Sequence, residues 1–477
     1  MRIVNFANMN MHFHAFLLFS NFNFKNPLFM KKIYMTLVVI IAAQISMFAQ
    51  TPWTMQNVGY NYNSSYPFDI DAVDSNIVWN CAGVGDGSGI SSQEFSMTMD
   101  GGNSWMAGLV TADTNFRFSN ISAVTENMCY AAMYNNTLGG GGIFKTTDMG
   151  ASWTQLAASS IYTNAASFPN VVYFTDSLNG WTMGDPVGGY FEIYSTTDGG
   201  ATWTRVPQAN ITAPIAGEYG LVNNFTVVGN KIWFGTNKGR VYISYNGGVN
   251  WTAKTIVSNI NTVGAIAFRD TLNGVCTKAT TAGVSSFFRT TDGGITWTQV
   301  TPAGPAFYSD LAYVPGTSVL FSCAASSTGR GSSYSANDGS SWILVDTNGI
   351  GTSDGYTSMD WISPLTGWAG GFSADPLTDG IYRYTGSAVG INQITKNTNL
   401  TSFPNPTSGL VRINTNYEGV VNVYVFDILG NLVTSFESFS TKVGLSVDLR
   451  NLSNGIYSVQ LVDLAGNSSV AKVVKNN

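Results

Sequence analysis

The sequence has 477 residues, of which only 10% are charged and 13% are aromatic, and it contains 51 glycines. This composition suits many short strands joined by tight turns, and it excludes an intrinsically disordered chain. The formal net charge is −6 and no basic cluster follows residue 50, so nucleic acid and anionic membrane surfaces are not expected partners.

The first 50 residues are predicted to lie outside the mature protein. Residues 30–50 combine a lysine pair, an apolar run and a cleavage position after Ala49, which are the three parts of a secretory signal peptide. Residues 1–29 match no targeting class. We interpret them as an upstream extension, with translation starting at Met30, and a genuine long leader is the alternative. The apolar run is shorter than the roughly 20 residues of a membrane-spanning helix, so no transmembrane span is expected in the mature chain.

Removal of residues 1–50 also changes the net charge and removes both histidines. The remaining 18 basic and 28 acidic residues give a net charge of −10, and no histidine is left, because His12 and His14 lie in the removed stretch. Without histidine, Ser-His-Asp catalysis, Cys-His catalysis and His-ligated zinc sites are excluded. We therefore expect neither a metal nor a cofactor.

The four cysteines fall in the same predicted strand of four different repeats; they are Cys81, Cys129, Cys276 and Cys323. An even number of cysteines in an exported protein is compatible with disulfides. Neighbouring cysteines are offset by an odd number of residues within their repeats, which predicts that they face opposite sides of their sheets. We expect free, buried thiols that pack as small apolar residues.

A strand–turn–strand phrase recurs seven times after residue 70. In its clearest copy, at 171–184, an apolar strand leads into a polar turn at Asp176–Gly180 and then into a second apolar strand. The other copies cover residues 70–83, 121–133, 225–235, 266–278, 311–324 and 359–370. Each copy predicts two antiparallel strands with a tight connection.

A second phrase, Ser/Thr-x-Asp/Asn-x-Gly-x-x-Trp, follows six of the seven copies. Its acid or amide and its tryptophan are Asp100 and Trp105, Asp148 and Trp153, Asp198 and Trp203, Asn246 and Trp251, Asp292 and Trp297, and Asn337 and Trp342. The tryptophans are 48, 50, 48, 46 and 45 residues apart. A period of roughly 40–50 residues is typical of β-propeller blades.

The repeated turn is predicted to be structural. A short Asp or Asn accepts backbone N–H groups two or three residues further on, and glycine at the fifth position adopts the left-handed backbone. The tryptophan, which opens the fourth strand, is expected to pack against its own or the next blade. Asn246 and Asn337 support this interpretation, because an amide closes a turn but cannot act as a general acid.

The seventh copy of the strand phrase has no tryptophan turn of its own. It continues into a third strand over 380–385 and stops there, while the mature chain opens on Trp53-Thr54-Met55-Gln56, which resembles the other fourth strands. We therefore predict that residues 53–58 complete the last blade. This closes a seven-bladed propeller over residues 51–386 and removes two exposed sheet edges.

The tryptophan turns resemble Asp-box (BNR) repeats. Together with the Asn-Gly-Trp phrase they make the chain similar to the seven-bladed propellers of the photosystem II assembly factor-like family, and more distantly to sialidases, sortilin-type receptors and xyloglucanase propellers. The resemblance implies the fold and leaves the activity open. Sialidases use an arginine triad, a tyrosine nucleophile and an early Arg-Ile-Pro motif, and no Arg-Ile-Pro occurs in this sequence.

The C-terminal part is predicted to be a separate small domain. A polar linker over 387–399 leads into short alternating strands over 400–477, which fit an Ig-like β-sandwich. Its motifs read Pro-Asn-Pro-x-x-Gly, Asp-x-x-Gly, Gly-x-Tyr and Lys-Val-Val-Lys, with the defined residues Pro404, Asn405, Pro406, Gly409, Asp427, Gly430, Gly455, Tyr457, Lys472 and Lys475. This ordered set resembles the type A C-terminal sorting domain of the type IX secretion system. The resemblance implies that the type IX machinery is a partner, and that the protein is secreted or attached to the outer cell surface once this domain is removed.

A functional site is expected at the end of the propeller opposite the repeated turns, where the connections vary. The acids there are Asp86, Glu94, Asp185, Glu192, Glu218, Asp310, Asp354, Asp375 and Asp379. Asp185 and Asp375 are the catalytic candidates because each precedes a proline at a matching loop position, and a glycosidase needs two carboxylates about 5–9.5 Å apart. The simpler interpretation is that all nine are solvated loop acids. The Asp86–Gly89 loop offers too few ligands to assign Ca²⁺.

Two functions from different classes follow. The first is a non-catalytic, secreted or cell-surface propeller that binds an unknown extracellular protein or glycan through its loop face. The alternative is a surface glycoside hydrolase that uses paired carboxylates on the same face. A third possibility is that the propeller spaces or protects other surface components.

Overall fold

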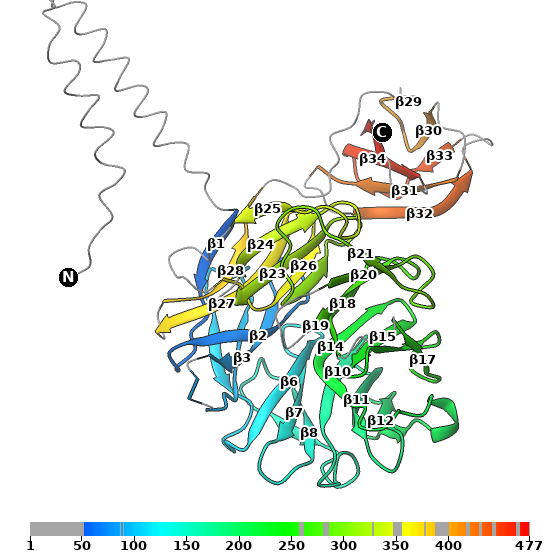
Figure 1. Ribbon diagram of the computed structural model, residues 1–477. Coiled ribbons are helices and arrows are strands. Elements are labelled where there is room, and N and C mark those ends of the chain that lie inside the picture. The colour runs from blue at the N-terminus through cyan, green and yellow to red at the C-terminus, as the bar shows by residue number, and fades with distance from the viewer. Residues whose placement is uncertain are drawn as a thin grey trace, which may run out of the picture. The chain divides into compact units, whose positions relative to one another are not determined.

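The computed structural model describes residues 52–476 with gaps at 86, 89, 257–261, 280–285, 327–328, 347–354, 376–377, 387–399, 416–419, 429–431, 441–444 and 464–467. The predicted upstream extension, signal peptide and linker therefore lie outside the described residues. Two kinds of sheet assembly account for what is described: a ring of four-stranded blades over 53–384, and a pair of smaller sheets over 401–475 (Figure 1).

Seven four-stranded antiparallel sheets make the blades, and the chain order of strands in each sheet is the spatial order except in blade 7. Blade 1 contains β2 (Ser65–Ala72), β3 (Val78–Val84), β4 (Glu94–Thr98) and β5 (Met106–Leu109). Blade 2 contains β6 (Phe116–Ala123), β7 (Cys129–Asn135), β8 (Gly141–Thr146) and β9 (Thr154–Leu156). Blade 3 contains β10 (Pro169–Phe174), β11 (Gly180–Pro186), β12 (Phe191–Thr196) and β13 (Thr204–Arg205), followed by a single 3-10 turn, η1 (Gln208–Asn210).

The remaining blades repeat this order. Blade 4 contains β14 (Gly220–Val228), β15 (Lys231–Thr236), β16 (Arg240–Ser244) and β17 (Thr252–Thr255). Blade 5 contains β18 (Thr262–Phe268), β19 (Gly274–Ala279), β20 (Ser286–Thr290) and β21 (Thr298–Val300). Blade 6 contains β22 (Asp310–Tyr313), β23 (Leu320–Ser326), β24 (Gly329–Ser335) and β25 (Ile343–Asp346). Blade 7 contains β26 (Met359–Ser363), β27 (Thr366–Asp375), β28 (Thr378–Tyr384) and β1 (Trp53–Asn57).

Blade 7 is assembled from both ends of the propeller sequence. The first strand of the described chain, β1, pairs antiparallel with β28, with Trp53 opposite Tyr384 and Met55 opposite Tyr382. Figure 1 shows blue β1 beside yellow β27 and β28. The first strands of successive blades contact one another from β2 through β6, β10, β14, β18, β22 and β26, and β26 contacts β2 again, so the ring is closed.

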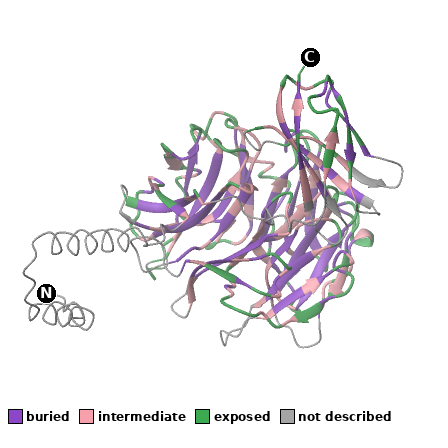
Figure 2. Ribbon diagram, turned by 90° about the horizontal axis from the view of Figure 1, so that it is seen from above, coloured by how far each residue is buried: buried purple, intermediate pink, exposed green. Residues whose placement is uncertain are grey.

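The hydrophobic core is divided among the blade interfaces. Each of the seven interfaces holds one buried cluster of the described residues. Buried residues follow the strands, and exposed residues lie mainly in the turns (Figure 2). Between blades 1 and 2, for example, Trp79 and Phe95 pack with Ala131 and Met133. Large side chains of this kind contribute about 1.5–3 kcal/mol each when fully buried. The ring is therefore stabilised mainly by contacts between neighbouring blades.

The repeated tryptophans pack toward the preceding blade, not the next one. Trp153 of blade 2 contacts Trp79 of blade 1, with ring centroids 6.2 Å apart, and Trp251 of blade 4 contacts Trp181 of blade 3 at 5.8 Å. Trp53 has the same role in blade 7, because its ring lies 6.4 Å from Phe321 of blade 6 and its indole Nε1 donates to Ser332 Oγ at 3.0 Å. The rings also contact their own blade, as predicted, since Trp251 lies 5.2 Å from Phe234 and Trp297 lies 5.9 Å from Phe268. The alternative prediction, contact with the next blade, was wrong, because the tryptophan side chains project from the face of the sheet that stacks on the preceding blade.

All four cysteines are buried and free. Cys81 of blade 1 and Cys129 of blade 2 belong to the same cluster between these blades. As predicted from the odd offset, the two thiols lie on opposite faces of their sheets. Because the blades are stacked, one face of blade 1 packs against the opposite face of blade 2, and both thiols therefore lie in the same interface. The thiols are reduced and act as small apolar side chains of the interface.

The C-terminal domain is a sandwich of two antiparallel sheets. One sheet has the order β29 (Thr401–Phe403), β30 (Leu410–Asn414) and β33 (Leu445–Asp448). The other has the order β32 (Leu432–Ser440), β31 (Val420–Phe426), β34 (Gly455–Asp463) and β35 (Ser468–Lys475). Alternate residues of both sheets, such as Val411 and Val447 from the first and Val423 and Val459 from the second, share one buried core.

The predicted fold class is confirmed: an all-β, seven-bladed propeller is followed by a small β-sandwich. Within the part of the chain that the structure describes, no helix is long and apolar enough to cross a bilayer.

Candidate binding face

The turns of each blade divide the propeller into two ends. The Asp-box turn between the third and fourth strands hydrogen-bonds to the turn between the first and second strands of the same blade; Gly199 N donates to Leu178 O at 2.8 Å, and Gly293 N donates to Leu272 O at 2.8 Å. These two kinds of turn therefore share one end, which we name the Asp-box end. The connections from second to third strands and from blade to blade lie at the opposite end, which we name the loop face.

The Asp-box carboxylates accept hydrogen bonds from residues of their own turns. Asp198 Oδ1 accepts the backbone N–H of Thr202 at 2.9 Å and the hydroxyl of Thr196 at 2.8 Å, while Oδ2 accepts the hydroxyl of Thr202 at 2.6 Å. The bond spans four residues instead of the expected two or three, because the turn is one residue wider. The Thr202 hydroxyl and backbone N–H lower the pKa of Asp198 to about 2. Asp100, Asp148 and Asp292 make the same bonds.

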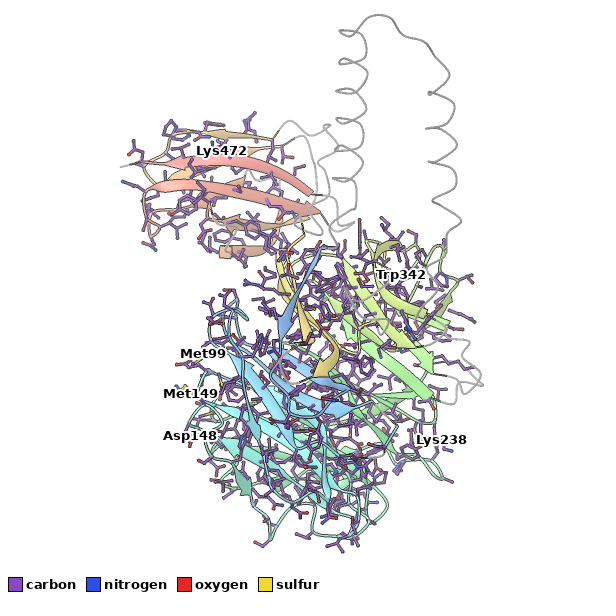
Figure 3. All side chains as sticks on the ribbon, turned by 90° about the vertical axis from the view of Figure 1, so that its left-hand side faces the viewer. Met99, Asp148, Met149, Lys238, Trp342 and Lys472 are labelled. Atoms are coloured by element: carbon purple, nitrogen blue, oxygen red, sulfur yellow. The ribbon has the colours of Figure 1, made fainter. Side chains whose placement is uncertain are left out.

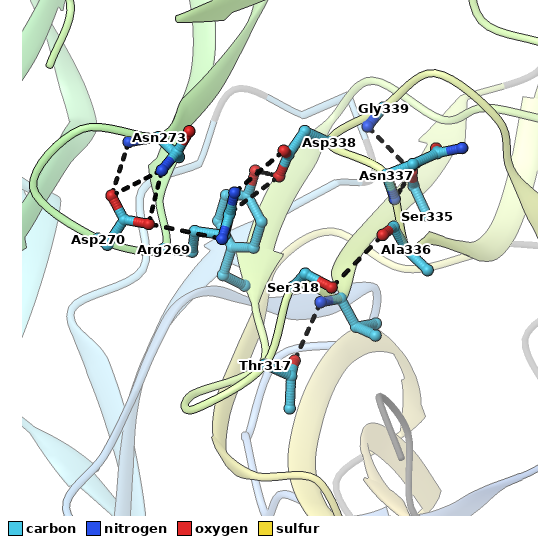
Figure 4. A network of polar contacts seen from close by, with 12 residues as sticks. Arg269, Asp270, Asn273, Thr317, Ser318, Ser335, Ala336, Asn337, Asp338 and Gly339 are labelled. Atoms are coloured by element: carbon cyan, nitrogen blue, oxygen red, sulfur yellow. Dashed lines mark hydrogen bonds and ion pairs between the residues drawn. The ribbon is translucent and has the colours of Figure 1, made fainter. Parts of the chain in front are cut away.

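The two amide versions of the turn keep the same acceptor. Asn246 Oδ1 accepts Asn250 N at 3.0 Å, and Asn337 Oδ1 accepts Ser341 N at 2.8 Å. Figure 4 shows the second of these turns, in which the neighbouring Asp338 also binds Arg269 of blade 5, with Nε and Oδ1 3.1 Å apart. The turns hold a blade together and link it to its neighbour, and their polar atoms are used for that purpose.

On the loop face, Asp185 is a partner of the neighbouring blade. Its Oδ1 accepts Asn170 Nδ2 at 2.7 Å and Gly220 N of blade 4 at 3.0 Å. Burial raises the pKa of Asp185 to about 6, which these two hydrogen bonds oppose. Asp375 ends β27 opposite Thr378, and its side chain lies outside the described residues. Among the described side chains, the carboxylate that acts on Asp185 is that of Glu192, whose negative charge adds to the rise in pKa and whose Oε1 accepts the Tyr194 hydroxyl.

Two further acids predicted for this face are buried at the start of third strands. Glu94 of blade 1 is 1% exposed and accepts Asn61 N through Oε1 at 2.9 Å, and Glu192 of blade 3 is 3% exposed and accepts the Tyr194 hydroxyl at 2.8 Å. Each stands four residues before its Asp-box Ser or Thr. Asp379 is also buried, whereas Asp86 and Asp354 lie outside the described residues.

The equivalent position in blade 4 carries Arg240, and it forms a buried ion pair. Arg240 Nη1 lies 2.7 Å from Oε2 of Glu218, and both side chains are buried. Glu218 also accepts Thr236 Oγ1 at 2.8 Å and Ile215 N at 2.9 Å. The connection from blade 3 into blade 4 is thereby fixed at three points. This pair was not predicted from the sequence. The residue four places before the Asp box is glutamate only in blades 1 and 3, and it is Gly142, Ser286 and Gly331 in blades 2, 5 and 6, so Arg240 does not stand out in an alignment of the repeats.

This fixed connection exposes apolar side chains at the loop face. Ile215 is 50% exposed and Tyr219 is 48% exposed. The backbone of Tyr219 is held by Asn237, whose Oδ1 accepts Tyr219 N at 2.8 Å, and the next residue, Lys238, is labelled in Figure 3. We name Ile215, Tyr219, Asn237 and Lys238 the blade 4 rim. It combines an apolar side chain, an aromatic ring, an amide and a cation on a rigid base.

Four other carboxylates line the centre of the ring. Each accepts a backbone N–H from the first strand of the following blade: Asp310 accepts Met359 at 2.8 Å, Asp360 accepts Ala72 at 2.8 Å, Asp69 accepts Ile121 at 2.9 Å and Asp71 accepts Ala123 at 2.7 Å. Asp310 was predicted to lie among the loop-face acids, and the structure places its carboxylate in this inner set. The inner edges of blades 7, 1 and 2 are therefore capped by side chains of the blade before them.

Burial shifts these inner acids toward their neutral form. It raises the pKa of Asp69 and of Asp310 to about 7 and that of Asp360 to about 6, and the mutual repulsion of the four carboxylates adds to the shift for Asp69 and Asp310. No group of three or more His, Cys, Asp or Glu among the described residues is arranged to hold a metal ion. The Asp86–Gly89 loop, where Ca²⁺ was considered, lies partly outside the described residues.

The sorting-motif residues divide into buried and exposed groups. Gly409, Tyr457 and Lys475 are buried, Asp427 and Gly455 are half-buried, and Pro404, Asn405, Pro406 and Lys472 are exposed. Gly430 lies outside the described residues.

Comparisons with known proteins divide the chain in the same way. Residues 136–375 match the family model described as photosynthesis system II assembly factor YCF48, and residues 401–476 match the model described as secretion system C-terminal sorting domain. No curated protein matches the chain.

Solved structures of similar fold include YCF48 bound to D1 peptide, with 17% identity, coverage of 71% of this chain and 96% of that chain, and a TM-score of 0.50. YCF48 from Cyanidioschyzon merolae is 15% identical, with 70% and 98% coverage and a TM-score of 0.47. The GH74 enzyme of Niastella koreensis is 15% identical, with 88% and 74% coverage and a TM-score of 0.47. At these identities, the likeness to the first structure shows the fold alone.

Proposed function

Because the chain belongs to the photosynthesis system II assembly factor YCF48 family and carries a secretion system C-terminal sorting domain, we propose that it acts outside the cell as a non-catalytic binding propeller. The type IX system exports it, and its loop face engages an extracellular protein or glycan. Export is supported by the sorting domain over 401–476. The binding role is supported by the arrangement of the loop face.

The blade 4 rim carries this proposal. An exposed loop that orders only on binding loses conformational entropy at that moment, and a loop that is already fixed avoids most of this cost. The Glu218–Arg240 pair, buried and joined to the backbone of Ile215, fixes the connection before any ligand arrives. Ile215 and Tyr219 remain about half exposed on it. Aromatic and apolar anchors beside polar groups are the usual composition of a binding surface.

The acids of the loop face argue for binding without turnover. Asp185, Glu94 and Glu192 are acceptors for neighbouring backbone or side-chain groups and lie at least partly buried. A glycosidase needs two carboxylates that face a substrate-sized space. The described carboxylates instead accept hydrogen bonds from the protein. Asp185 accepts the Gly220 N–H of the next blade, Glu94 accepts the Asn61 N–H, and Glu192 accepts the Tyr194 hydroxyl within blade 3.

Peptides are the first ligand class to test, since a propeller of the same fold has been solved as YCF48 bound to D1 peptide. The experiment applies the purified mature protein to a peptide array and to a glycan array, and measures the affinity of each hit. Replacement of Ile215 by Ser together with Tyr219 by Ala is expected to weaken binding at least tenfold while the melting temperature stays unchanged.

A matched control is available at the other end. Leu178 and Leu272 are 54% and 49% exposed in turns of the Asp-box end, so a Leu178→Ser/Leu272→Ser variant removes a similar apolar area. It should bind as the wild type does. Equal loss in both variants would contradict a site at the blade 4 rim. Hydrolysis of any arrayed glycan, abolished by Asp185→Asn or Asp375→Asn, would instead establish the glycosidase alternative.

A further inference from the structure

The two ends of the sorting domain meet at its last strand. Asn405, from the Pro-Asn-Pro motif, donates Nδ2 to the carbonyl of Lys472 at 2.7 Å and accepts Val474 N through Oδ1 at 2.8 Å. Ser402 also donates its hydroxyl to the carbonyl of Lys472, at 3.1 Å. Motifs that are about 70 residues apart in sequence thus form one structural unit on β35.

Thr407 extends this contact along the same edge. Its backbone N–H donates to Val474 O at 2.8 Å, and its carbonyl accepts Asn476 N at 2.9 Å. The edge of β35 that does not pair with β34 is therefore occupied over 472–476 by the segment 402–407. An unpaired edge strand would invite pairing with another chain, and this segment prevents it.

The two lysines of the Lys-Val-Val-Lys motif have different environments. Lys475 is 4% exposed, and its ammonium donates to the carbonyl of Leu452 at 2.6 Å. Lys472 is exposed and alternates with Ala471 and Val473, whose side chains enter the core. Lys475 thus closes the domain, whereas no hydrogen bond or ion pair involves the Lys472 ammonium among the described residues.

The other buried motif residues also serve the fold. Tyr457 buries its ring and donates its hydroxyl to Ser453 O at 2.7 Å. Gly409 has a φ of 152°, and a Cβ there would lie 2.4 Å from Cγ of Arg450, so a side chain does not fit. Apart from Asn405, whose side chain is hydrogen-bonded to β35, the described motif residues with exposed side chains are Pro404, Pro406 and Lys472.

We infer that the secretion machinery reads the folded edge formed by Pro404, Pro406 and Lys472, and that Lys472 is the residue its receptor contacts. Asn405 and Lys475 are positioning residues, since they hold this edge together without presenting a free charge. The inference rests on the proposed export route. The chemistry of the edge, one free cation beside two rigid apolar rings, fits a receptor surface with a carboxylate next to an apolar patch.

The test measures export of the full-length chain in a cell that has a type IX system. The readout is the ratio of surface-bound plus released protein to periplasmic protein. Lys472→Glu is expected to lower this ratio at least tenfold, and Lys472→Arg, which keeps the cation, is expected to restore it. Protein recovered from the periplasm of the Lys472→Glu strain should melt at the wild-type temperature, since the side chain contributes nothing to the core.

The matched control is Arg412→Glu, which makes the same change of charge at an exposed residue of β30, in the other sheet. It should be exported normally. Lys475→Met should reduce export and also lower the melting temperature or expose the domain to proteolysis. Normal export of Lys472→Glu, or an equal defect in Arg412→Glu, would overturn the inference.

Deletion of residues 400–477 separates this inference from the export route itself. If the deletion accumulates in the periplasm while Lys472→Glu is exported, only the role of Lys472 fails. If the deletion is exported normally, the assignment of the sorting function fails as well.

Discussion

Asn223 of blade 4 donates its side-chain amide to the carboxylate of Asp69 in blade 1, 2.8 Å away, across the centre of the ring. The backbone of Asn223 is left-handed, with φ at 51°, at the point where the pairing of β14 with β15 shifts register. Asparagine tolerates this conformation better than most residues. The contact links two blades that are not neighbours, so the ring is held across its diameter as well as around its circumference.

Replacement of Asn223 should show the two roles of this residue separately. Asn223→Ala removes the hydrogen bond and places an ordinary side chain in the left-handed region, which together should lower the stability by about 2–4 kcal/mol. Asn223→Gly removes the same bond but suits the backbone, so its loss should be about 1–2 kcal/mol smaller. Denaturant unfolding of the mature protein measures both. Equal losses would show that the positive φ carries no cost.

The inner carboxylates predict a specific dependence of stability on pH. The folded-state pKa of Asp310 is about 7 and that of Asp360 is about 6, against an ordinary value of 3.8. The folded protein therefore binds these protons more tightly than the unfolded chain does. This contribution is fully present below about pH 4 and is lost as the pH rises through 6 to 7. The melting temperature of the mature protein should fall between pH 5 and pH 8.

In an Asp310→Asn or Asp360→Asn variant, the melting temperature should change less between pH 5 and pH 8 than in the wild type. Each should gain about 1–3 kcal/mol over the wild type at pH 8 and nothing at pH 4, because an amide accepts the same N–H without a buried charge. Asn120 already does this in blade 2, where its Oδ1 accepts Val172 N at 2.8 Å. A variant that is less stable than the wild type by the same amount at pH 4 and at pH 8 would contradict this prediction.

The Asp-box turns predict a contrast between two substitutions of one residue. Asp198→Asn keeps the acceptor for Thr202 N, as Asn246 does for Asn250, so the melting temperature at pH 7 should stay near that of the wild type. Asp198→Ala should lower it, because the Thr202 N–H and the Thr196 and Thr202 hydroxyls lose their shared acceptor.

The stability contributed by the Asp-box turns should depend on pH in the opposite direction to that contributed by the inner acids. The pKa of Asp198 is lowered to about 2, so its stabilising effect is present above about pH 4 and is lost as the pH falls toward 2. Thermal scans at pH 2, 3 and 4 on Asp198→Asn and the wild type measure this. If Asp198→Ala matched Asp198→Asn at every pH, the turn would not depend on its acceptor.

Local pattern was enough to predict the blades. Seven strand phrases and six tryptophan turns depend on alternation and turn chemistry within about 15 residues, and β1 was recognised because Trp53-Thr54 resembles other fourth strands. The blade that each tryptophan contacts was predicted less well. Which neighbour Trp153 contacts depends on the stacking of blades, and no local pattern contains that information.

The candidate site depends on contacts that are distant in sequence. Glu218 and Arg240 are 22 residues apart, and Asn223 and Asp69 are 154 apart. Neither pair has a motif, since their proximity follows from ring geometry. Asp185 was predicted as a catalytic candidate from its Asp-Pro pattern, and that pattern does not reveal that its carboxylate accepts a hydrogen bond from the next blade. Likewise, the sequence order of the sorting motifs conceals that Asn405 lies against Lys472.

The last prediction concerns the closure of the ring by β1. Trp53 is 1% exposed, and its ring lies 5.3 Å from that of Tyr384 and 5.8 Å from that of Trp361, in the interface between blades 6 and 7. Trp53→Ala should lower the stability by about 3–5 kcal/mol, the usual cost of deleting a large buried aromatic ring. Hydrogen exchange should rise first in β28, whose outer partner is β1. Differential scanning calorimetry and exchange mass spectrometry measure the two effects.

Met55, in the same strand, provides the control. It is 43% exposed, so Met55→Ala removes a side chain from β1 without opening the interface and should cost less than about 1 kcal/mol. Trp53→Phe, which keeps an aromatic ring but loses the donor to Ser332, should fall between the two. If Trp53→Ala were no more destabilising than Met55→Ala, or if exchange in β28 stayed slow, the ring would not depend on β1 for its closure. The seventh blade would then be stable with three strands alone.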